Sequence, residues 1–395
     1  MSPLRVLHVI PSLDLAHGGP SRAIRLMAKA LQQQGAIVHI ATTDDAGPKR
    51  RCTPEARHAL IAEGAGHWHV FPKRSEFYKV SPGLARWLRQ HVADYDVVHL
   101  HALFSFSSLA AAWAARIAAV PYIVRPLGTL TTYGVTQRRP WLKQLSLRWL
   151  EGPMLRHAAA VHFTADAERD EALALGISLQ PVVIPLAVEE LPPPDPTGLI
   201  RQCPTMPIPG YLLFLSRLDP KKNLEALLQA MALLEPQYPD LTLVVVGEGS
   251  PAYVAQLKTL AAVLGIAERV CWTGFLDGAL KSAVLADASL FVLPSFSENF
   301  GIAAAEALQA GLPCVLGEGV AIAAQVQAAG AGRAVAPTPE AVAEAIVFYA
   351  SDMSRGTDAA RQARVLAMSA FSAQAMASSL IKLYRDVIHF GREFR

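Results

Sequence analysis

Short apolar runs alternate with longer amphipathic segments along most of the chain. This alternation is typical of strand–helix units that build parallel sheets. In the first half it predicts strands at residues 5–10, 36–42, 67–71, 96–101, 122–125, 159–164 and 181–184, and in the second half at 211–216, 241–246, 270–273, 289–293, 313–316 and 333–335. Two α/β series follow one another, so we expect two doubly wound domains.

Helices are expected between the strands. The first, at residues 20–34, has Pro20 at its start and Gly35 after its end, residues that suit those positions. The second series predicts helices at residues 223–234, 251–264, 278–286 and 301–309, and a helical tail from about 340 to 390. Seven prolines between Glu189 and Gly210 speak against a helix or a central strand there. We therefore predict domains at 1–190 and 211–370, a linker at 191–210, and a C-terminal helix at 371–395 that packs back on the first domain.

Composition narrows the class of protein. Hydrophobic residues make up 52% of 395 and charged residues 17%, which excludes disordered and coiled-coil proteins. A net charge of +3 speaks against nucleic acid as a partner. The four cysteines lack a C-x-x-C pair, so we expect a reduced, cytoplasmic protein without a thiolate metal site. No apolar run is suited to spanning a membrane.

Three loops that follow strands carry candidate chemistry. His17-Gly18-Gly19-Pro20 lies at a helix start, where glycine backbone and a helix N-terminus suit an anion or a sugar, although a plain tight turn has the same pattern. Arg217 and Lys222 follow the first strand of the second half and suit a diphosphate, unless they are ordinary solvated residues.

The third loop is the sharpest signal. Glu298 lies in the loop after a strand, and Glu306 lies on the helix that begins at Gly301. Carboxylates would repel a diphosphate, so we expect Glu306 to accept ribose hydroxyls and Glu298 to bind a sugar. The N–H groups near Phe300 and Ile302 would then hold phosphate oxygens.

These residues together resemble the retaining glycosyltransferase family 4, the group 1 glycosyltransferases of GT-B fold. The resemblance covers nearly the whole chain and rests on these positions: Arg217 and Lys222, Gly247-Glu248-Gly249, Gly274, the Glu298-x7-Glu306 pair, His17 to Pro20, and His99-x-His101. It implies two Rossmann-like domains facing across a cleft, with a nucleotide diphosphate sugar held by the second.

The resemblance also implies roles for individual residues. Catalytic roles fall to His101, Glu298, Arg217 and Lys222, and donor binding to Gly18, Gly19, Arg217, Lys222, Gly247, Glu298, Asn299, Phe300, Gly301, Ile302 and Glu306. No metal and no cofactor are expected. We expect only one of His99 and His101 to face the cleft, with His99 in the core and His101 in the donor sugar pocket. Asn223 stands where the family often has glycine.

The predicted reaction is transfer of a hexose to a glycan or lipid-linked acceptor in surface polysaccharide assembly. A basic, Trp-bearing helix at residues 140–151 favours peripheral contact with the inner face of the membrane. The alternative for this helix is that Leu142, Leu145 and Trp149 pack inward. Two other functions stay open: an NAD-dependent oxidoreductase, because Gly247-x-Gly249-x-x-Ala252 imitates a dinucleotide fingerprint, and an inert GT-B-like sugar-binding protein.

Overall fold

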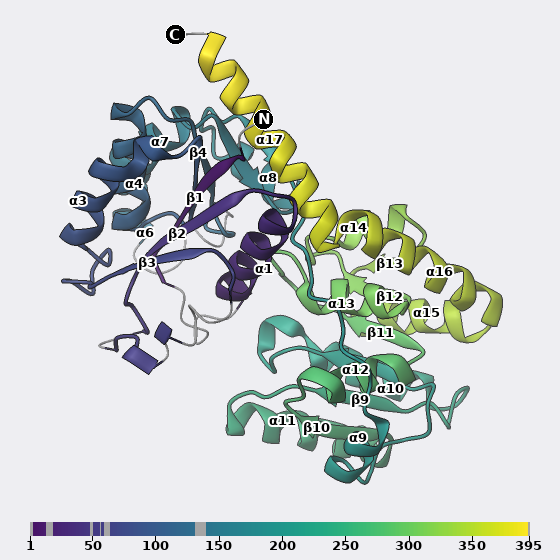
Figure 1. The fold of residues 1–395 in the computed structure, drawn as a ribbon. Coiled ribbons are helices and arrows are strands. Elements are labelled where there is room, and N and C mark those ends of the chain that lie inside the picture. Colours follow the sequence, from purple (N-terminus) through teal and green to yellow (C-terminus); the bar gives the residue numbers. More distant parts are fainter. Residues whose placement is uncertain are drawn as a thin grey trace. The chain divides into compact units, whose positions relative to one another are not determined.

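The computed structural model describes residues 3–12, 19–47, 50–55, 57–58, 64–130 and 140–393. The chain forms two units (Figure 1): residues 1–187 together with 373–395, and residues 188–372. Each unit contains one parallel sheet. The expected two-domain α/β organisation is therefore present, and the C-terminal helix belongs to the first unit.

The first unit has a seven-stranded parallel sheet in the order β3-β2-β1-β4-β5-β6-β7. Its strands are β1 (Arg5–Ile10), β2 (Ile37–Thr43), β3 (His67–Phe71), β4 (Val97–His101), β5 (Tyr122–Arg125), β6 (Ala160–Phe163) and β7 (Pro181–Val183). All seven expected strands are present. Strands β4, β5 and β6 are buried along their whole length, as expected for a parallel sheet covered on both faces.

Helices cover both faces of this sheet. They are α1 (Gly19–Gln33), α3 (Pro82–His91), α4 (Phe106–Ile117), α6 (Pro140–Ser146), a π-helical turn (Leu147–Glu151), α7 (Gly152–Arg156), α8 (Asp166–Ala174) and α17 (Ala373–Glu393). Met27 of α1 and Leu380 of α17 share one core with the strands, whereas Leu88 of α3 belongs to the core on the opposite face. The final helix α17 thus completes the first unit, and the Gln34 amide binds the carbonyl of Gln374 at 3.1 Å.

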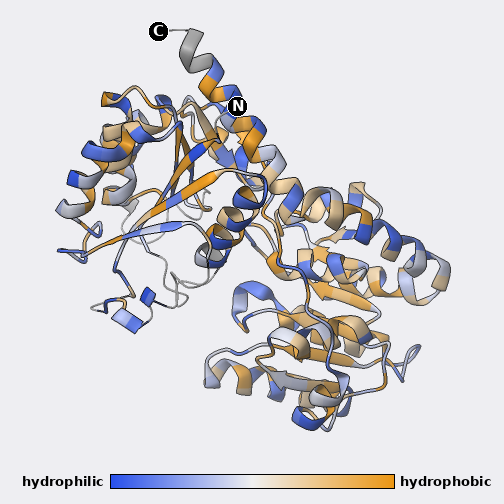
Figure 2. Ribbon diagram, viewed as in Figure 1, coloured by the Kyte–Doolittle hydropathy of each residue, from blue (hydrophilic) through white to orange (hydrophobic). Residues whose placement is uncertain are grey.

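The second unit has six parallel strands in the order β10-β9-β8-β11-β12-β13. The strands are β8 (Leu212–Leu215), β9 (Leu243–Val246), β10 (Val270–Gly274), β11 (Leu290–Leu293), β12 (Cys314–Gly317) and β13 (Gly332–Val335). The helices of this unit are α9 (Pro196–Gln202), α10 (Leu224–Leu234), α11 (Pro251–Val263), α12 (Gly278–Asp287), α13 (Ile302–Ala310), α14 (Ala323–Ala328), α15 (Pro339–Ala350) and α16 (Met353–Ala370). Figure 2 shows these strands as mainly hydrophobic.

Both sheets have the strand order 3-2-1-4-5-6, and the first extends it by one strand. In such sheets the connections leave in opposite directions on either side of the first strand, and ligands bind there, outside the carboxyl ends of the strands. The relevant pairs are β1 with β4 and β8 with β11. No described helix combines the length and apolar character that crossing a membrane requires.

Two expectations about helices need correction. The proline-rich segment was expected to contain no helix, but α9 lies within it. The Asp195 side chain accepts a hydrogen bond from the Gly198 N–H at 2.8 Å, and Pro196 occupies the first helical position, where its missing N–H does no harm. The tail is also not helical throughout: α15, α16 and α17 are separated by short breaks at residues 351–352 and 371–372.

Candidate functional site

An ion pair joins two loops at the carboxyl edge of the second sheet. Lys222 follows β8 and Glu298 follows β11, and the Lys222 Nζ contacts the Glu298 Oε1. The two side chains are only 12% and 21% exposed. Because β8 and β11 are neighbours in the sheet, loops far apart in the sequence meet at this point. The structure therefore brings together the cation and the carboxylate that the sequence marked separately.

Backbone hydrogen bonds hold these loops in place. The Phe296 N–H donates to the Lys221 carbonyl at 2.9 Å, and the Glu298 N–H donates to the Gly319 carbonyl at 2.9 Å. Asn223 has a left-handed backbone (φ 54°, ψ 42°), and its amide donates to the carbonyls of Pro294 and Pro337. Asparagine tolerates this conformation better than most residues, which explains why it can stand where glycine is usual.

Helix α13 starts beside this ion pair with open N–H groups. Gly301 precedes the helix with φ 100°, and no side chain caps its first turn. A Cβ at Gly301 would lie 2.8 Å from the Val320 Cγ1. Phe300 is buried edge-to-face against Phe371, with ring centroids 5.6 Å apart. Uncapped N–H groups at a helix N-terminus attract anions, so the loop is suited to a phosphate.

Glu306 lies on α13 and is bound by a lysine that sequence reasoning missed. The Lys281 Nζ of α12 donates to the Glu306 Oε1 at 2.9 Å, and both side chains are mostly buried. The only sequence signal for Lys281 is its position one turn after Asp277, the residue that caps α12. Lys281 therefore compensates the charge of this carboxylate.

The remaining second-unit candidates lie on the same edge. Arg217 is exposed and makes no hydrogen bond or ion pair to any described residue. Asn299 is exposed as well, and 39% of Ile302 is exposed. A Cβ at Gly247 would lie 1.9 Å from the Ser216 carbonyl oxygen. Only glycine therefore allows the backbones after β8 and β9 to approach this closely.

The strands of the first sheet carry buried histidines, whereas ion pairs of this unit lie beyond the ends of β2 and β3, as between Lys73 and Asp45. His8 on β1, His99 and His101 on β4, and His162 on β6 are all fully buried. The alternation of side chains from which only one of His99 and His101 was expected to face the cleft is wrong. Residues two apart in a strand lie on the same face of the sheet, and these two rings are 4.4 Å apart between centroids.

Burial determines the protonation of these rings. It lowers the pKa of His8 and His162 to about 3, and that of His99 and His101 well below the usual value. The neutral His162 donates from Nε2 to the Ile184 carbonyl at 2.8 Å, so its Nδ1 accepts from the His99 Nε2 at 3.3 Å. His99 Nδ1 then accepts from the Tyr384 hydroxyl of α17 at 2.8 Å. His99 is a core residue, as expected, and it helps to anchor α17.

His8, His99 and His101 are close enough together to be considered as metal ligands. One nitrogen from each lies within 4.8 Å of the others. However, both nitrogens of His99 already make hydrogen bonds, and the buried cation of Arg125 lowers the pKa of all three rings. A second cation in the same place would be repelled, so these residues do not fit a metal ion.

Family models match most of the chain. The model described as "Glycosyl transferases group 1" matches residues 207–365, which include every second-unit candidate. The model described as "Glycosyl transferase 4-like domain" matches residues 18–187. The chain belongs to the group 1 glycosyltransferases. The expected family and activity class are thereby confirmed: the protein is a glycosyltransferase.

Relatives agree with this group 1 assignment, and a solved structure agrees with the fold. The chain is 29% identical to a phosphatidyl-myo-inositol mannosyltransferase of Mycobacterium leprae over 78% of this chain and 77% of that protein. It is 24% identical to the GDP-mannose:cellobiosyl-diphosphopolyprenol alpha-mannosyltransferase of Komagataeibacter xylinus, over 98% and 94%. The structure of Anabaena Alr3699/HepE in complex with UDP has a TM-score of 0.76 at 19% identity and covers 97% of this chain and 100% of that one. The GT-B fold is confirmed.

Three residues of the first unit were expected to take part in donor binding or catalysis, and the structure places them differently. Gly18, with the neighbouring His17, lies outside the described residues. Gly19 is the first residue of α1. His101 is fully buried beside His8, with its Nε2 2.9 Å from the His8 Nδ1.

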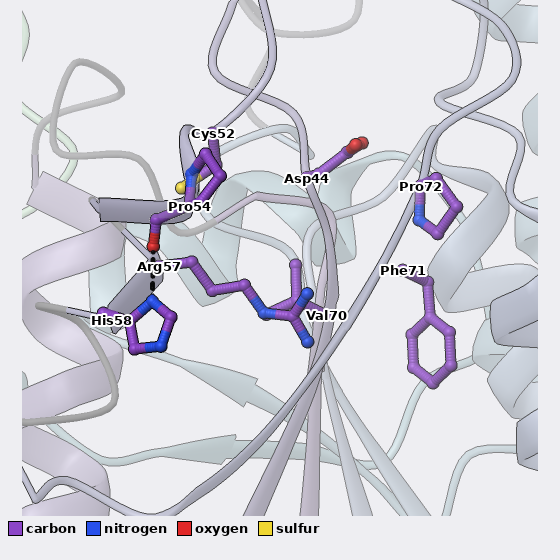
Figure 3. A pocket seen from close by; sticks show the side chains of 8 residues that line it. All are labelled: Asp44, Cys52, Pro54, Arg57, His58, Val70, Phe71 and Pro72. Atoms are coloured by element: carbon purple, nitrogen blue, oxygen red, sulfur yellow. Dashed lines mark hydrogen bonds between the residues drawn. The ribbon is translucent and has the colours of Figure 1, made fainter.

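A pocket of about 610 Å³ lies at the carboxyl ends of β2 and β3 in the first unit. Figure 3 shows its lining, which consists of Asp44, Cys52, Pro54, Arg57, His58, Val70, Phe71 and Pro72. The His58 Nδ1 lies 2.9 Å from the Pro54 carbonyl oxygen. No sequence motif marks this pocket, because its lining comes from the end of β3 and from the segments that follow β2 and β3.

Proposed function

We propose that this glycosyltransferase transfers a hexose from a nucleotide diphosphate sugar to a glycan or lipid-linked saccharide, with retention at the anomeric carbon. The observation that carries the proposal is the group at one edge of the second sheet: the Lys222–Glu298 pair, the uncapped start of α13 and the Lys281–Glu306 pair. A relative named for GDP-mannose and a neighbour bound to UDP-glucose support a donor of this class.

Each residue has a role in the proposed reaction. Lys222, Arg217 and the N–H groups of α13 bind the diphosphate and stabilise the charge that develops as the bond between the anomeric carbon and the phosphate oxygen breaks. Glu298 binds the sugar and Glu306 the ribose hydroxyls. The acceptor oxygen forms its new bond on the face that the diphosphate leaves, and its proton passes to the leaving phosphate. No metal takes part in this scheme.

Ligand-induced stabilisation tests the donor class. Thermal melting with UDP, GDP, ADP and the matching hexose conjugates should show a marked increase in melting temperature for one base. A ligand at 100 times its dissociation constant stabilises the folded state by about 2.7 kcal/mol. Transfer should survive EDTA. Stabilisation by NAD alone would favour an oxidoreductase, and nucleotide binding without transfer or donor hydrolysis would favour an inert sugar-binding protein.

We propose that the acceptor is met by the first unit at the cytoplasmic face of a membrane. The enzyme would then take part in surface polysaccharide assembly. Trp141 and Trp149 are each 65% exposed, and Leu145 is 51% exposed, so the alternative in which Leu145 and Trp149 pack inward is wrong. On the same helical stretch Arg148 is exposed and Lys143 is half-buried over the Phe104 ring, whereas Arg138 and Arg139 lie outside the described residues. Exposed aromatic and basic residues on one helix favour an anionic lipid surface.

Cosedimentation with vesicles tests the membrane contact. Vesicles of 70% phosphatidylcholine and 30% phosphatidylglycerol should bind the protein at low salt, and binding should fall with salt because each basic residue contributes about 1 kcal/mol near the surface. Trp141→Ser combined with Trp149→Ser should reduce binding severalfold, while Trp68→Phe, in the sheet, should not. A parent protein that stays in the supernatant at low salt contradicts the proposal.

A further inference from the structure

Arg125 is a buried cation without a partner among the described residues. It is the last residue of β5 and is 2% exposed, and its Nε makes no hydrogen bond. No hydrogen bond or ion pair within the described part of the chain holds the guanidinium group. Burial lowers the pKa of Arg125 only to about 10, so the group stays charged at neutral pH. An unpaired buried charge is strongly destabilising.

The carboxylate near Arg125 is already used by other groups. Glu168 Oε1 accepts from the Gly128 N–H at 2.7 Å, and its Oε2 accepts from the N–H and the hydroxyl of Thr164 at 2.8 and 2.9 Å. Glu168 therefore orders the loop after β5, in which Leu127 and Gly128 have positive φ angles. Its charge raises the pKa of Arg125 from a distance, but it makes no ion pair with the guanidinium.

Two ring nitrogens beside Arg125 also lack partners. Arg125 is the register partner of His101 on the neighbouring strand, so both side chains lie on one face of the sheet. His101 Nδ1 and His8 Nε2 are buried and unpaired, while the other two nitrogens share a hydrogen bond at 2.9 Å. Both rings are neutral, so each carries one proton. Whichever ring accepts the hydrogen bond that they share has its own proton on its unpaired nitrogen. The three residues thus offer a guanidinium and an imidazole N–H.

The rest of the buried polar layer is satisfied. His99, His162 and Tyr384 form a complete chain of hydrogen bonds that ends at the Ile184 carbonyl. Arg125 and His101 end their strands at the carboxyl edge of the sheet, and His8 lies two residues before the end of β1, the neighbour of β4. Parallel sheets of this strand order bind ligands at that edge. Buried polar groups without partners indicate a missing ligand more readily at this edge than elsewhere.

We propose that Arg125, His8 and His101 form a subsite for one anionic group of the acceptor, a phosphate ester or a carboxylate. Such a group accepts charge-assisted hydrogen bonds from guanidinium and imidazole N–H groups and compensates the buried charge. The assignment to the acceptor rests on the proposed function, in which Lys222, Arg217 and α13 of the second unit already serve the donor diphosphate.

Inorganic phosphate is the probe for this subsite. Calorimetric titration at constant ionic strength, with the donor site filled by saturating UDP, should show one phosphate bound per parent chain. Arg125→Met should weaken that binding at least tenfold, and Arg125→Lys, which keeps the charge but not the planar group, should weaken it less. Arg116→Met, on the exposed side of α4, is the matched control and should bind like the parent. Parallel titration with acetate shows whether a carboxylate also fits.

The melting temperature of Arg125→Met without ligand provides a second readout. It should rise if Arg125 is a ligand-binding residue and fall if Arg125 has only a structural role. Without ligand, Arg125→Met should melt at a higher temperature than the parent because an unpaired buried charge is removed. A lower melting temperature, or phosphate binding equal to that of the parent, overturns the proposal, as does a parent that binds neither phosphate nor acetate. If UDP abolishes phosphate binding, the anion belongs to the donor and the acceptor assignment is wrong. A parent that binds no nucleotide contradicts the proposed function instead, and the phosphate titration still stands.

Discussion

Both sheets place their first and fourth strands side by side, β1 with β4 and β8 with β11, yet they carry polar residues at this point in different ways. In the second sheet β8 and β11 are apolar, and the charged residues lie beyond their ends, where Lys222 pairs with Glu298 in the loops and Lys281 of α12 pairs with Glu306 of α13. In the first sheet the strands themselves carry His8, His101 and Arg125.

This difference has a physical cause. Loops at the edge of a sheet remain partly hydrated, so charged pairs can form there and can be opened by a ligand at modest expense. Side chains within strands are dry, so the histidines must be neutral and hydrogen-bonded to be tolerated. We infer that the second edge is arranged to exchange partners with a charged ligand, whereas the first is a buried polar layer with one uncompensated cation, Arg125.

The largest expected effect concerns Lys222, which we expect to exchange Glu298 for a diphosphate. Lys222→Ala should lower kcat by about 100- to 1000-fold, the usual loss when one group that stabilises a developing charge is removed. Steady-state transfer assays measure this effect. Lys258→Ala, on the surface of α11, is the control and should be neutral. If folded Lys222→Ala protein turns over like the parent, the ion pair is only structural and the two edges are less different than we infer.

A somewhat smaller effect is expected when the pH falls, because acid should lower the free energy of unfolding through the buried histidines of the first sheet. The pKa of His162 is about 3 in the folded state and about 6.5 when unfolded, so the unfolded state binds the extra proton between these values. Stability is therefore full above pH 6.5 and falls as the pH drops, by about 1.4 kcal/mol per pH unit for each such histidine.

Replacing His162 tests this prediction. His162→Gln can keep the hydrogen bonds to Ile184 and His99, but it should remove about 2 kcal/mol of the loss between pH 6.5 and pH 5. Urea unfolding followed by tryptophan fluorescence measures the difference, since most tryptophans lie in the first unit. His157→Gln, on the surface, should leave the slope unchanged. Equal slopes in all three proteins would mean that the layer takes up no protons on unfolding.

The smallest effect separates the two glutamates. Glu306→Ala should weaken binding of the free nucleoside diphosphate about tenfold, or 1.4 kcal/mol, because the ribose contact is lost. Glu298→Ala should bind the free diphosphate nearly as the parent does and should mainly reduce turnover. Calorimetry with the diphosphate and with the intact donor distinguishes the two. Similar losses of diphosphate affinity in both variants would show that the carboxylates act together rather than on separate parts of the donor.

Much of the fold follows from local sequence patterns. Each expected strand is present to within two residues, because a buried parallel strand needs a continuous apolar run whatever it packs against. The positions of Arg217, Lys222, Glu298 and Glu306 after strands could be inferred as well, since the carboxyl ends of parallel strands meet at one edge. Helix α9 does not follow from the number of prolines in this segment but from their positions, because Asp195 and Pro196 form a normal helix start.

Which side chains contact one another was decided only by the tertiary structure. Lys281 reaches Glu306 because α12 lies beside α13, and Tyr384 meets His99 because the last helix packs on the first sheet. Nothing within a few residues of Arg125 shows that its guanidinium is buried without an ion pair. Local sequence determines which residues favour a strand, a helix or a loop, whereas the distances between side chains far apart in the chain, and hence burial and charge compensation, arise only when the sheets are packed.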